Sequence, residues 1–401
     1  MTIPNNNPNT IFTRTTPDDG VLFGTEFSRL YANDNELQNQ VNYLETQFDP
    51  QSQLSNTPNW SSPSSSIAPS AKALDARAKS LIPLKRFAGW MTDFWVLRTT
   101  PAADVLTSVC WASELNLFVA VGVTASNNQA MTSSDAVNWT ARPISGNNVW
   151  SFVCWSPQLS LFVAVGSSGT NPVMTSPDGI IWTSRVSPEN NWNSVCWSPQ
   201  LSLFVAVGSS GTNPVMTSPD GIIWTSRITS NFSWNSVCWS PELSLFVVVG
   251  SGTSGVMTSP DGITWTTITG IPGNNWRSVC WSPELHLFVA VALNGTGNRV
   301  MTSPNGINWT SRLSAADSLW SSVCWSPELY LFVAVAKIGT GNYIMTSPDG
   351  TNWSLRSGAA DNSWESVCWS PQLGIFAAVS SGSNSNRVMT SGSGLGVGYL
   401  G

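Results

Sequence analysis

The chain repeats one pattern of short apolar runs and polar turns from residue 106 to residue 391. In the copy that begins at Ser194, the apolar pentad SVCWS leads into a Ser-Pro-Gln-Leu turn, and the run LFVAVG then ends at Gly208. The run PVMTS follows, and Pro-Asp-Gly connects it to IIWTSR, which ends at Arg227. Pro and Gly are turn residues here, and an unbroken apolar run of this length is typical of a strand buried on both faces. Each copy is therefore predicted to form four short β-strands, with Pro-Asp-Gly as the last hairpin.

The number of copies follows from the seven cysteines, because each of them stands in the motif Val-Cys-Trp. They lie 42 or 44 residues apart, at Cys110, Cys154, Cys196, Cys238, Cys280, Cys324 and Cys368. Four strands in about 40–45 residues is the period of a β-propeller blade. The seventh copy lacks a fourth strand, but FWVLRTTP at 94–101 matches the fourth strand of the other copies. We therefore expect a mainly β fold, a seven-bladed β-propeller over 91–401, in which Trp95–Arg98 completes the last blade and removes the exposed sheet edges.

The hairpin between the third and fourth strands resembles the Asp-box of sialidase-type propellers. In the second copy it reads Ser176-Pro-Asp178-Gly179-Ile-Ile-Trp182. Asp is expected to accept backbone N–H bonds across the turn, Gly to adopt a positive φ, and Trp to pack beneath. We interpret this motif as structural rather than catalytic.

Ligand-binding residues are expected in the loops between the second and third strands and in the loops between blades. These two sets differ among copies and are rich in Asn, Ser, Thr and Gly, while the strands are nearly constant. Loops on a rigid scaffold commonly carry binding residues. Candidates are Tyr343 and a tryptophan four residues before each cysteine except the first: Trp150, Trp192, Trp234, Trp276, Trp320 and Trp364. For the tryptophans two interpretations stay open, stacking on a ligand at the mouth of the propeller and packing between blades.

Other repeated polar residues are interpreted as parts of the scaffold. Six arginines follow the fourth strands, at Arg98, Arg142, Arg185, Arg227, Arg312 and Arg356. They could form a ring that binds acidic sugars, but we favour surface arginines on outermost strands, each bonded to a carboxylate or a carbonyl. The cysteines are expected to be unpaired, because neighbouring blades hold equivalent positions too far apart for a disulfide.

The inventory of reactive residues argues against an enzyme. The single histidine, His286, aligns with Ser or Tyr in other copies, which indicates an exposed position before a strand rather than a general base. Neither a phosphate-binding loop, a nucleophile elbow nor a zinc-ligand cluster is present, so no catalytic residue, cofactor or metal is expected. Net charge is −6 and the pI is near 4.8, with no basic stripe, which argues against nucleic acid. Neither a signal-peptide core nor a membrane-spanning run is found, so membrane insertion is not expected.

The first ninety residues have a different organisation. Apolar residues at heptad spacing predict a coiled-coil helix over 25–48 that forms a homo-oligomer, with Asp34 as the polar exception; the positions are Phe27, Leu30, Asp34, Leu37, Val41, Leu44 and Phe48. A single amphipathic helix packed on its own chain is the alternative. Residues 1–24 are interpreted as an attachment segment, and 49–90 as a Ser/Pro/Asn linker with one short helix.

Two resemblances bear on function. The repeat SVCWSPQLSLFVAVG followed by VMTSPDGIIWTSR is similar to repeats in virion-associated proteins of bacteriophages and large DNA viruses. The segment NTIFTRTTPDDGVLFGTEFSRLYANDNELQ resembles the N-terminal attachment segment of phage tail fibres. These likenesses imply a virion protein, assembled in the host cytoplasm, that binds other tail proteins through its N-terminus and presents the propeller outward.

The leading hypothesis is therefore an oligomeric phage tail fibre or tail appendage, with a trimer favoured, whose propeller recognises a host-surface glycan or protein. A purely structural virion component, such as a tail collar or a capsid decoration, is the alternative. A glycan hydrolase is the third and weakest hypothesis.

Overall fold

The computed structural model describes residues 95–391, except 102–104, 124–128, 145–147, 168–170, 210–212, 231, 254, 338–342 and 383–385. The predicted attachment segment, the coiled-coil positions from Phe27 to Phe48 and the linker lie outside the described residues, as do 91–94 and 392–401. Within the described part, no helix has the length and apolar character needed to cross a membrane.

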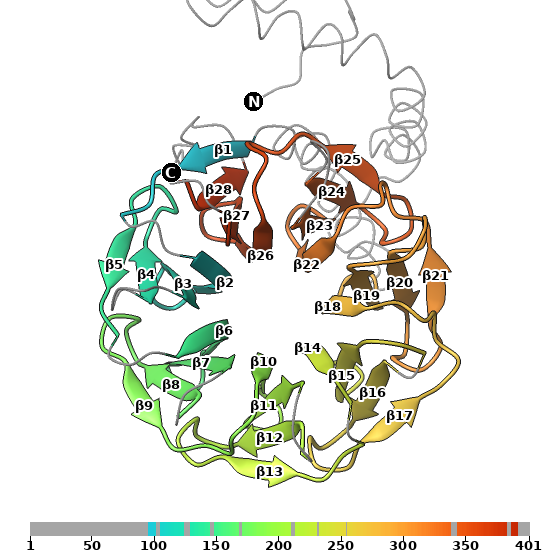
Figure 1. Ribbon diagram of the computed structural model, residues 1–401, viewed down its shortest axis with the longest axis horizontal. Coiled ribbons are helices and arrows are strands. Elements are labelled where there is room, and N and C mark those ends of the chain that lie inside the picture. Colours follow the sequence, from blue (N-terminus) through green and yellow to red (C-terminus); the bar gives the residue numbers. More distant parts are fainter. Residues whose placement is uncertain are drawn as a thin grey trace, which may run out of the picture. The chain divides into compact units, whose positions relative to one another are not determined.

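The described residues form seven four-stranded antiparallel sheets arranged as blades around a central axis (Figure 1). The innermost strands are β2 (Val105–Ala112), β6 (Val149–Ser156), β10 (Trp192–Ser198), β14 (Trp234–Ser240), β18 (Trp276–Ser282), β22 (Trp320–Ser326) and β26 (Trp364–Ser370). The second strands are β3 (Leu117–Val123), β7 (Leu161–Ser167), β11 (Leu203–Gly208), β15 (Leu245–Gly250), β19 (Leu287–Ala292), β23 (Leu331–Ala336) and β27 (Ile375–Ser380). The third strands are β4 (Ala130–Ser133), β8 (Val173–Ser176), β12 (Val215–Ser218), β16 (Val256–Ser259), β20 (Val300–Ser303), β24 (Ile344–Ser347) and β28 (Val388–Ser391). The outermost strands are β1 (Trp95–Arg98), β5 (Thr140–Arg142), β9 (Thr183–Arg185), β13 (Thr225–Arg227), β17 (Thr266–Ile268), β21 (Thr310–Arg312) and β25 (Ser354–Arg356).

The ring is closed by β1, which is the outermost strand of the last blade, as the sequence predicts. Its strand order is β1-β28-β27-β26, so three strands from the carboxyl end pair with one from the other end of the domain. Arg98 lies opposite Val388 in this sheet, in the same register as Arg185 opposite Val173 in the second blade. The last joint is therefore built like the others, and no blade is left with an unpaired third strand.

The hydrophobic core lies between blades, in one cluster for each joint. Along β11, Phe204 and Ala206 face the preceding blade, while Val205 and Val207 face the following one. All four are fully buried. The second strand is thus covered on both faces, which explains why its sequence is a continuous apolar run.

Every innermost strand carries a β-bulge near its first residue. In β10 the bulge falls between Trp192, which pairs with Gly208, and Ser194, which pairs with Val207. Asn193 is therefore the extra residue, without a partner across the ladder. The same shift recurs in the other six blades.

The Pro-Asp-Gly hairpin has the structural role predicted for it. Asp178 Oδ1 accepts the N–H groups of Ile180 and Ile181 at 2.8 and 3.0 Å, and the Trp182 indole donates to the carbonyl of Gly179. Gly179 has a φ of +71°, which favours glycine because it has no Cβ. In the first blade, where glycine is replaced, Ala136 adopts a φ of +58° instead.

Candidate functional site

The two variable loop sets lie side by side on one face, which we call the loop face. In the third to seventh blades, a backbone hydrogen bond joins the loop after the second strand to the loop that leads into the same blade's innermost strand. Ser209 N–H donates to the Asn191 carbonyl at 3.0 Å, and Lys337 N–H donates to the Leu319 carbonyl at 2.9 Å. The equivalent bonds in three further blades are Ser251 to Ser233, Leu293 to Asn275 and Ser381 to Ser363. The loops are thus anchored to each other at their bases, where they emerge from the blades.

The six tryptophans at the start of the innermost strands are core residues, so of the two interpretations left open by the sequence, the structure favours packing between blades over stacking on a ligand. Trp150 is 2% exposed and the other five, Trp192, Trp234, Trp276, Trp320 and Trp364, are 0% exposed. Trp192, for example, packs against Val163, Val165 and Val173 of the preceding blade. Tyr343, also expected to bind ligand, is 8% exposed and lies in the cluster around Trp364. Packing between blades accounts for all seven side chains, because their ring faces are covered.

The bulge residues form a ring at the loop-face end of the innermost strands. We call this set the bulge ring; its members are Thr107, Ser151, Asn193, Asn235, Arg277, Ser321 and Glu365. Four of them fasten their blade to the next one by donating to the carbonyl of the residue that precedes the next bulge. The bonds are Thr107 to Trp150 at 2.6 Å, Asn193 to Trp234 at 2.8 Å, Asn235 to Trp276 at 2.8 Å and Ser321 to Trp364 at 2.6 Å.

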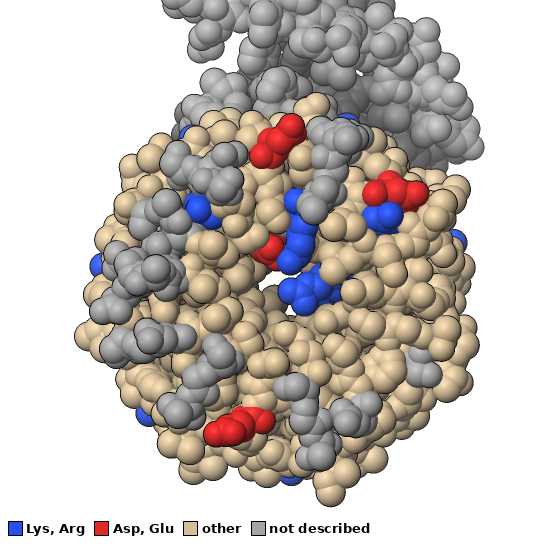
Figure 2. Space-filling view, in the orientation of Figure 1, with Lys and Arg blue, Asp and Glu red and all other residues tan. Residues whose placement is uncertain are grey.

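The two charged members of the bulge ring are engaged differently. Glu365 Oε2 forms an ion pair of 2.6 Å with Lys337 Nζ, and Glu365 Oε1 accepts a hydrogen bond from Ser381. Arg277 forms no hydrogen bond or ion pair with any described residue, although it lies within the electrostatic influence of Glu365. Burial lowers the pKa of Arg277, and the Glu365 carboxylate opposes this effect. Figure 2 shows basic and acidic atoms gathered at a central opening between the blades, against an otherwise largely uncharged surface.

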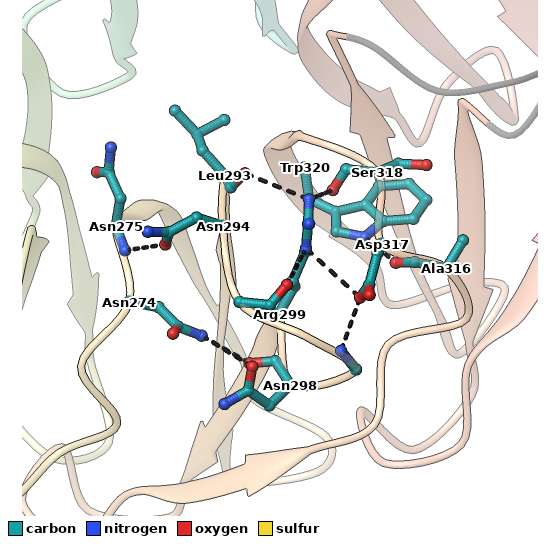
Figure 3. A network of polar contacts seen from close by, with 12 residues as sticks. Asn274, Asn275, Leu293, Asn294, Asn298, Arg299, Ala316, Asp317, Ser318 and Trp320 are labelled. Carbon is teal, nitrogen blue, oxygen red and sulfur yellow. Dashed lines mark hydrogen bonds and ion pairs between the residues drawn. The ribbon is translucent and has the colours of Figure 1, made fainter.

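A second arginine on the loop face, Arg299, acts as a brace between two loops (Figure 3). Arg299 Nη1 donates to the carbonyls of Leu293 and Ser318, and Nε donates to that of Gly295. Arg299 Nε also lies 3.5 Å from Asp317 Oδ1, which accepts the Gly297 N–H at 2.7 Å. The guanidinium therefore joins the loop after β19 to the loop before β22.

The repeated arginines of the outermost strands are also scaffold residues, but their partner differs from the expected one. Their Nε atoms donate to threonine hydroxyls of the third strand, not to a carboxylate or a carbonyl. The pairs, at 2.8–3.0 Å, are Arg98–Thr390, Arg142–Thr132, Arg185–Thr175, Arg227–Thr217, Arg312–Thr302 and Arg356–Thr346. Each arginine thus ties the outermost strand to its neighbour within one blade.

The cysteines and the histidine have the environments that the sequence indicates. All seven cysteines are free, and burial raises the pKa of every thiol, to about 12 for Cys324. They are therefore protonated at neutral pH and poor nucleophiles. His286 is exposed in the turn before β19, with a φ of +48°.

The bulge ring is the feature that sequence reasoning missed. Its signal is visible, since the residue after each of the six tryptophans varies between Ser, Asn, Arg and Glu inside an otherwise constant stretch. The variation is at one position only, and a bulge cannot be located from a strand pattern. The variable loops are therefore the stronger signal in the sequence.

Comparison with known proteins gives a likeness of fold. A scan of protein families finds no match to this chain, and no curated protein sequence matches it. Among solved structures, selenomethionine-substituted virginiamycin B lyase from Staphylococcus aureus is similar with a TM-score of 0.62 and 7% identity, over 74% of this chain and 97% of that one. YCF48 bound to a D1 peptide gives a TM-score of 0.56 and 14% identity, over 75% of this chain and 95% of that one. The GH74 enzyme of Niastella koreensis gives 0.59 and 14%, and the match covers 74% of this chain and 53% of that enzyme. At identities this low the likeness extends to the fold alone, and it agrees with the geometry: residues 95–391 form a seven-bladed β-propeller whose first strand completes the last blade.

Proposed function

We propose that this chain is a binding protein of a bacteriophage virion, which recognises a host-surface glycan or protein through its loop face. The observation that supports this best is the division between constant and variable parts. The blades share one scaffold and differ mainly on the loop face, where two loop sets are fastened to each other at their bases. A rigid scaffold that carries variable polar loops is suited to recognition, because little conformational freedom is lost when a ligand binds.

The virion setting follows from the resemblances of the repeat and of the N-terminal segment to phage proteins. In this proposal residues 1–24 attach the chain to other tail proteins, the helix at 25–48 makes a homo-oligomer such as a trimer, and the propeller faces the host. In this proposal the propeller binds its target without catalysis, and many of the polar side chains described on the loop face hold the loops and blades together.

One observation favours the structural alternative, a collar or decoration protein. The opposite face carries the Pro-Asp-Gly hairpins, whose second apolar residue is strongly exposed, with Ile181 at 69% and Ile223 at 68%. Repeated exposed isoleucines would suit packing against another virion component. The two functions use opposite faces, so they can be separated by experiment.

The test measures binding of the full-length protein to envelope vesicles from a panel of bacterial strains. Glu189→Arg, Thr296→Arg and Asp361→Arg place a bulky charge on exposed loop-face positions of three blades. The matched controls, Ile181→Arg and Ile223→Arg, place the same side chain on the opposite face. We expect at least one loop-face variant to lose binding to a strain that the controls still bind. Binding that survives all three loop-face changes and is lost in the controls would contradict the proposal and support the structural alternative.

A further inference from the structure

We propose that the loop-face end of the central channel is a binding site for an oxyanion, a carboxylate or a phosphate, held by Arg277 with Lys337 as a second cation. The inference deepens the proposed function and rests on it for the biological source of the anion. The site itself is argued from the residues at the channel mouth.

No described residue forms a hydrogen bond or an ion pair with Arg277. Four other bulge residues donate to the next blade, and the carbonyl that Arg277 could reach in the same way belongs to Trp320. Arg277 forms no hydrogen bond there or with any other described residue. The other arginines compared above form hydrogen bonds within the protein, Arg299 with three carbonyls and Arg312 with the Thr302 hydroxyl. A bulge re-aims a side chain, and here it presents at the channel mouth a guanidinium that no described residue binds.

The position of Arg277 has an energetic cost. A guanidinium stays protonated at any ordinary pH, so burial leaves Arg277 as a partly desolvated cation. Charges in such surroundings are normally paired, because the water that they lose must be replaced. Glu365 is too engaged to fill this role, since its two oxygens already bind Lys337 Nζ and the Ser381 hydroxyl, each at 2.6 Å. An incoming anion would supply the missing partner.

The two cations indicate the class of ligand. The guanidinium presents a planar fork of N–H donors that matches the two oxygens of a carboxylate or a phosphate. Lys337 carries a second positive charge at the same mouth, with its side chain 27% exposed. Glu365 lowers the net charge of the group to about one positive charge, which favours a small anion over a polyanion. A sugar acid and a phosphorylated glycan both offer this chemistry.

The experiment is calorimetric titration of the full-length protein with sodium glucuronate, with inorganic phosphate and with glucose as the neutral probe. We expect a Kd of about 1 mM or below for at least one anion, no binding of glucose, and weaker binding at high salt. Arg277→Gln should weaken anion binding at least about tenfold, because a charge-assisted pair is lost. Arg312→Gln, the same change on the outer rim, should leave it unchanged.

The variant Glu365→Gln tests whether Arg277, Lys337 and Glu365 form a binding site for an anion or only a cluster of charges that neutralise one another. Removal of the competing carboxylate should tighten anion binding by about threefold or more, since repulsion of the anion is relieved and Lys337 is released. If Arg277→Gln does not fold, Arg277→Lys keeps the charge without the fork and should bind anions more weakly than the wild type. Absence of binding by both anions, unchanged binding in Arg277→Gln, or weaker binding in Glu365→Gln would each overturn the inference.

The same titrations distinguish failure of this site from failure of the proposed function. If Arg277→Gln still binds vesicles and the wild type binds no anion, the proposal of host recognition stands and the proposal of an anion site is wrong. If the wild type binds an anion but binds vesicles of no strain, the proposal of an anion site stands and the proposal of host recognition is wrong. Binding of glucuronate but not of phosphate would identify the ligand as a carboxylate, and binding of phosphate but not of glucuronate would identify it as a phosphorylated group. Either result supports the site.

Discussion

The indole Nε1 of Trp111, in the first blade, donates a hydrogen bond of 2.6 Å to Oε1 of Gln372, in the seventh. The same contact joins every pair of neighbouring blades, and we call it the latch. The other six latches, at 2.6–2.7 Å, are Trp155–Glu114, Trp197–Gln158, Trp239–Gln200, Trp281–Glu242, Trp325–Glu284 and Trp369–Glu328. The joint between the ends of the domain is thus fastened by the same bond as the internal joints.

Loss of a latch should destabilise the ring by a similar amount wherever it occurs. Gln372→Leu and Gln200→Leu each remove the acceptor of one indole N–H, and we expect each to lower the free energy of unfolding by about 0.5–1 kcal/mol. Gln372→Glu keeps an acceptor of the kind present at Glu328 and should retain full stability at pH 7. Urea unfolding followed by tryptophan fluorescence measures all three. A negligible effect of Gln372→Leu beside a clear effect of Gln200→Leu would show that the closing joint is not formed in solution.

The Pro-Asp-Gly hairpins should make the stability of the propeller depend on pH in the acidic range. Partial burial acts to raise the pKa of Asp178, but the N–H groups of Ile181 and Ile180 and the Ser176 hydroxyl stabilise the carboxylate, and the pKa is lowered overall. Asp220, Asp261 and Asp349 are lowered in the same way. A carboxyl with a lowered folded pKa contributes stability above its unfolded pKa, about 3.9, and this contribution is lost as the pH falls through the folded pKa.

We therefore expect the thermal midpoint to fall as the pH is lowered from about 4. The quadruple variant Asp178→Asn, Asp220→Asn, Asp261→Asn and Asp349→Asn should show a shallower fall, because amides do not titrate. Asn305 shows that the hairpin accepts an amide, since its Oδ1 receives the N–H groups of Ile307 and Asn308 at 3.0 and 2.9 Å. Identical pH profiles for the two proteins would contradict this account of the hairpins.

The turn between the first and second strands carries a correctable backbone cost. Ser202 and Ser244 both have a φ of +48°, in the left-handed region that disfavours residues with a Cβ, and Gly374 occupies the equivalent place in the last blade. We expect Ser202→Gly to raise the free energy of unfolding by about 0.5–1 kcal/mol, and Gly374→Ser to lower it by a similar amount. A Cβ at residue 374 would meet nothing within 4 Å, so the loss would come from the backbone alone. Urea unfolding that gives the same sign for both changes would refute this explanation.

The repeat made the fold predictable, because each copy restates the same strands and turns. The number of blades, the buried second strand and the closing strand at Trp95–Arg98 all follow from aligned copies within one chain. The hairpin chemistry was predictable as well, since Asp178 and Gly179 have local roles that need no knowledge of the rest of the molecule.

Contacts between copies were harder to predict. The sequence pattern shows that the tryptophan at Trp192 recurs in the other blades. Repeated aromatic residues occur both in binding surfaces and in the joints between blades, and only the packing seen in the structure distinguishes the two. The latch from Trp111 to Gln372 and the bulge at Arg277 depend on how two blades meet, and on a shift of register that leaves no mark in the alternation of apolar residues. These are the contacts that place the candidate site.

The closed ring determines which residues share the loop face, and a disulfide across the closing strands tests it most directly. Val96 lies opposite Thr390 in the β1–β28 pair, so Val96→Cys with Thr390→Cys brings two thiols within bonding range. In the control, Val96→Cys with Met389→Cys, the second thiol points to the other side of the sheet. We predict that mild oxidation of the folded protein forms the 96–390 disulfide, detected as a linked peptide by mass spectrometry, and not the 96–389 disulfide. No 96–390 disulfide, or equal yields from the two pairs, would contradict the closed seven-bladed ring.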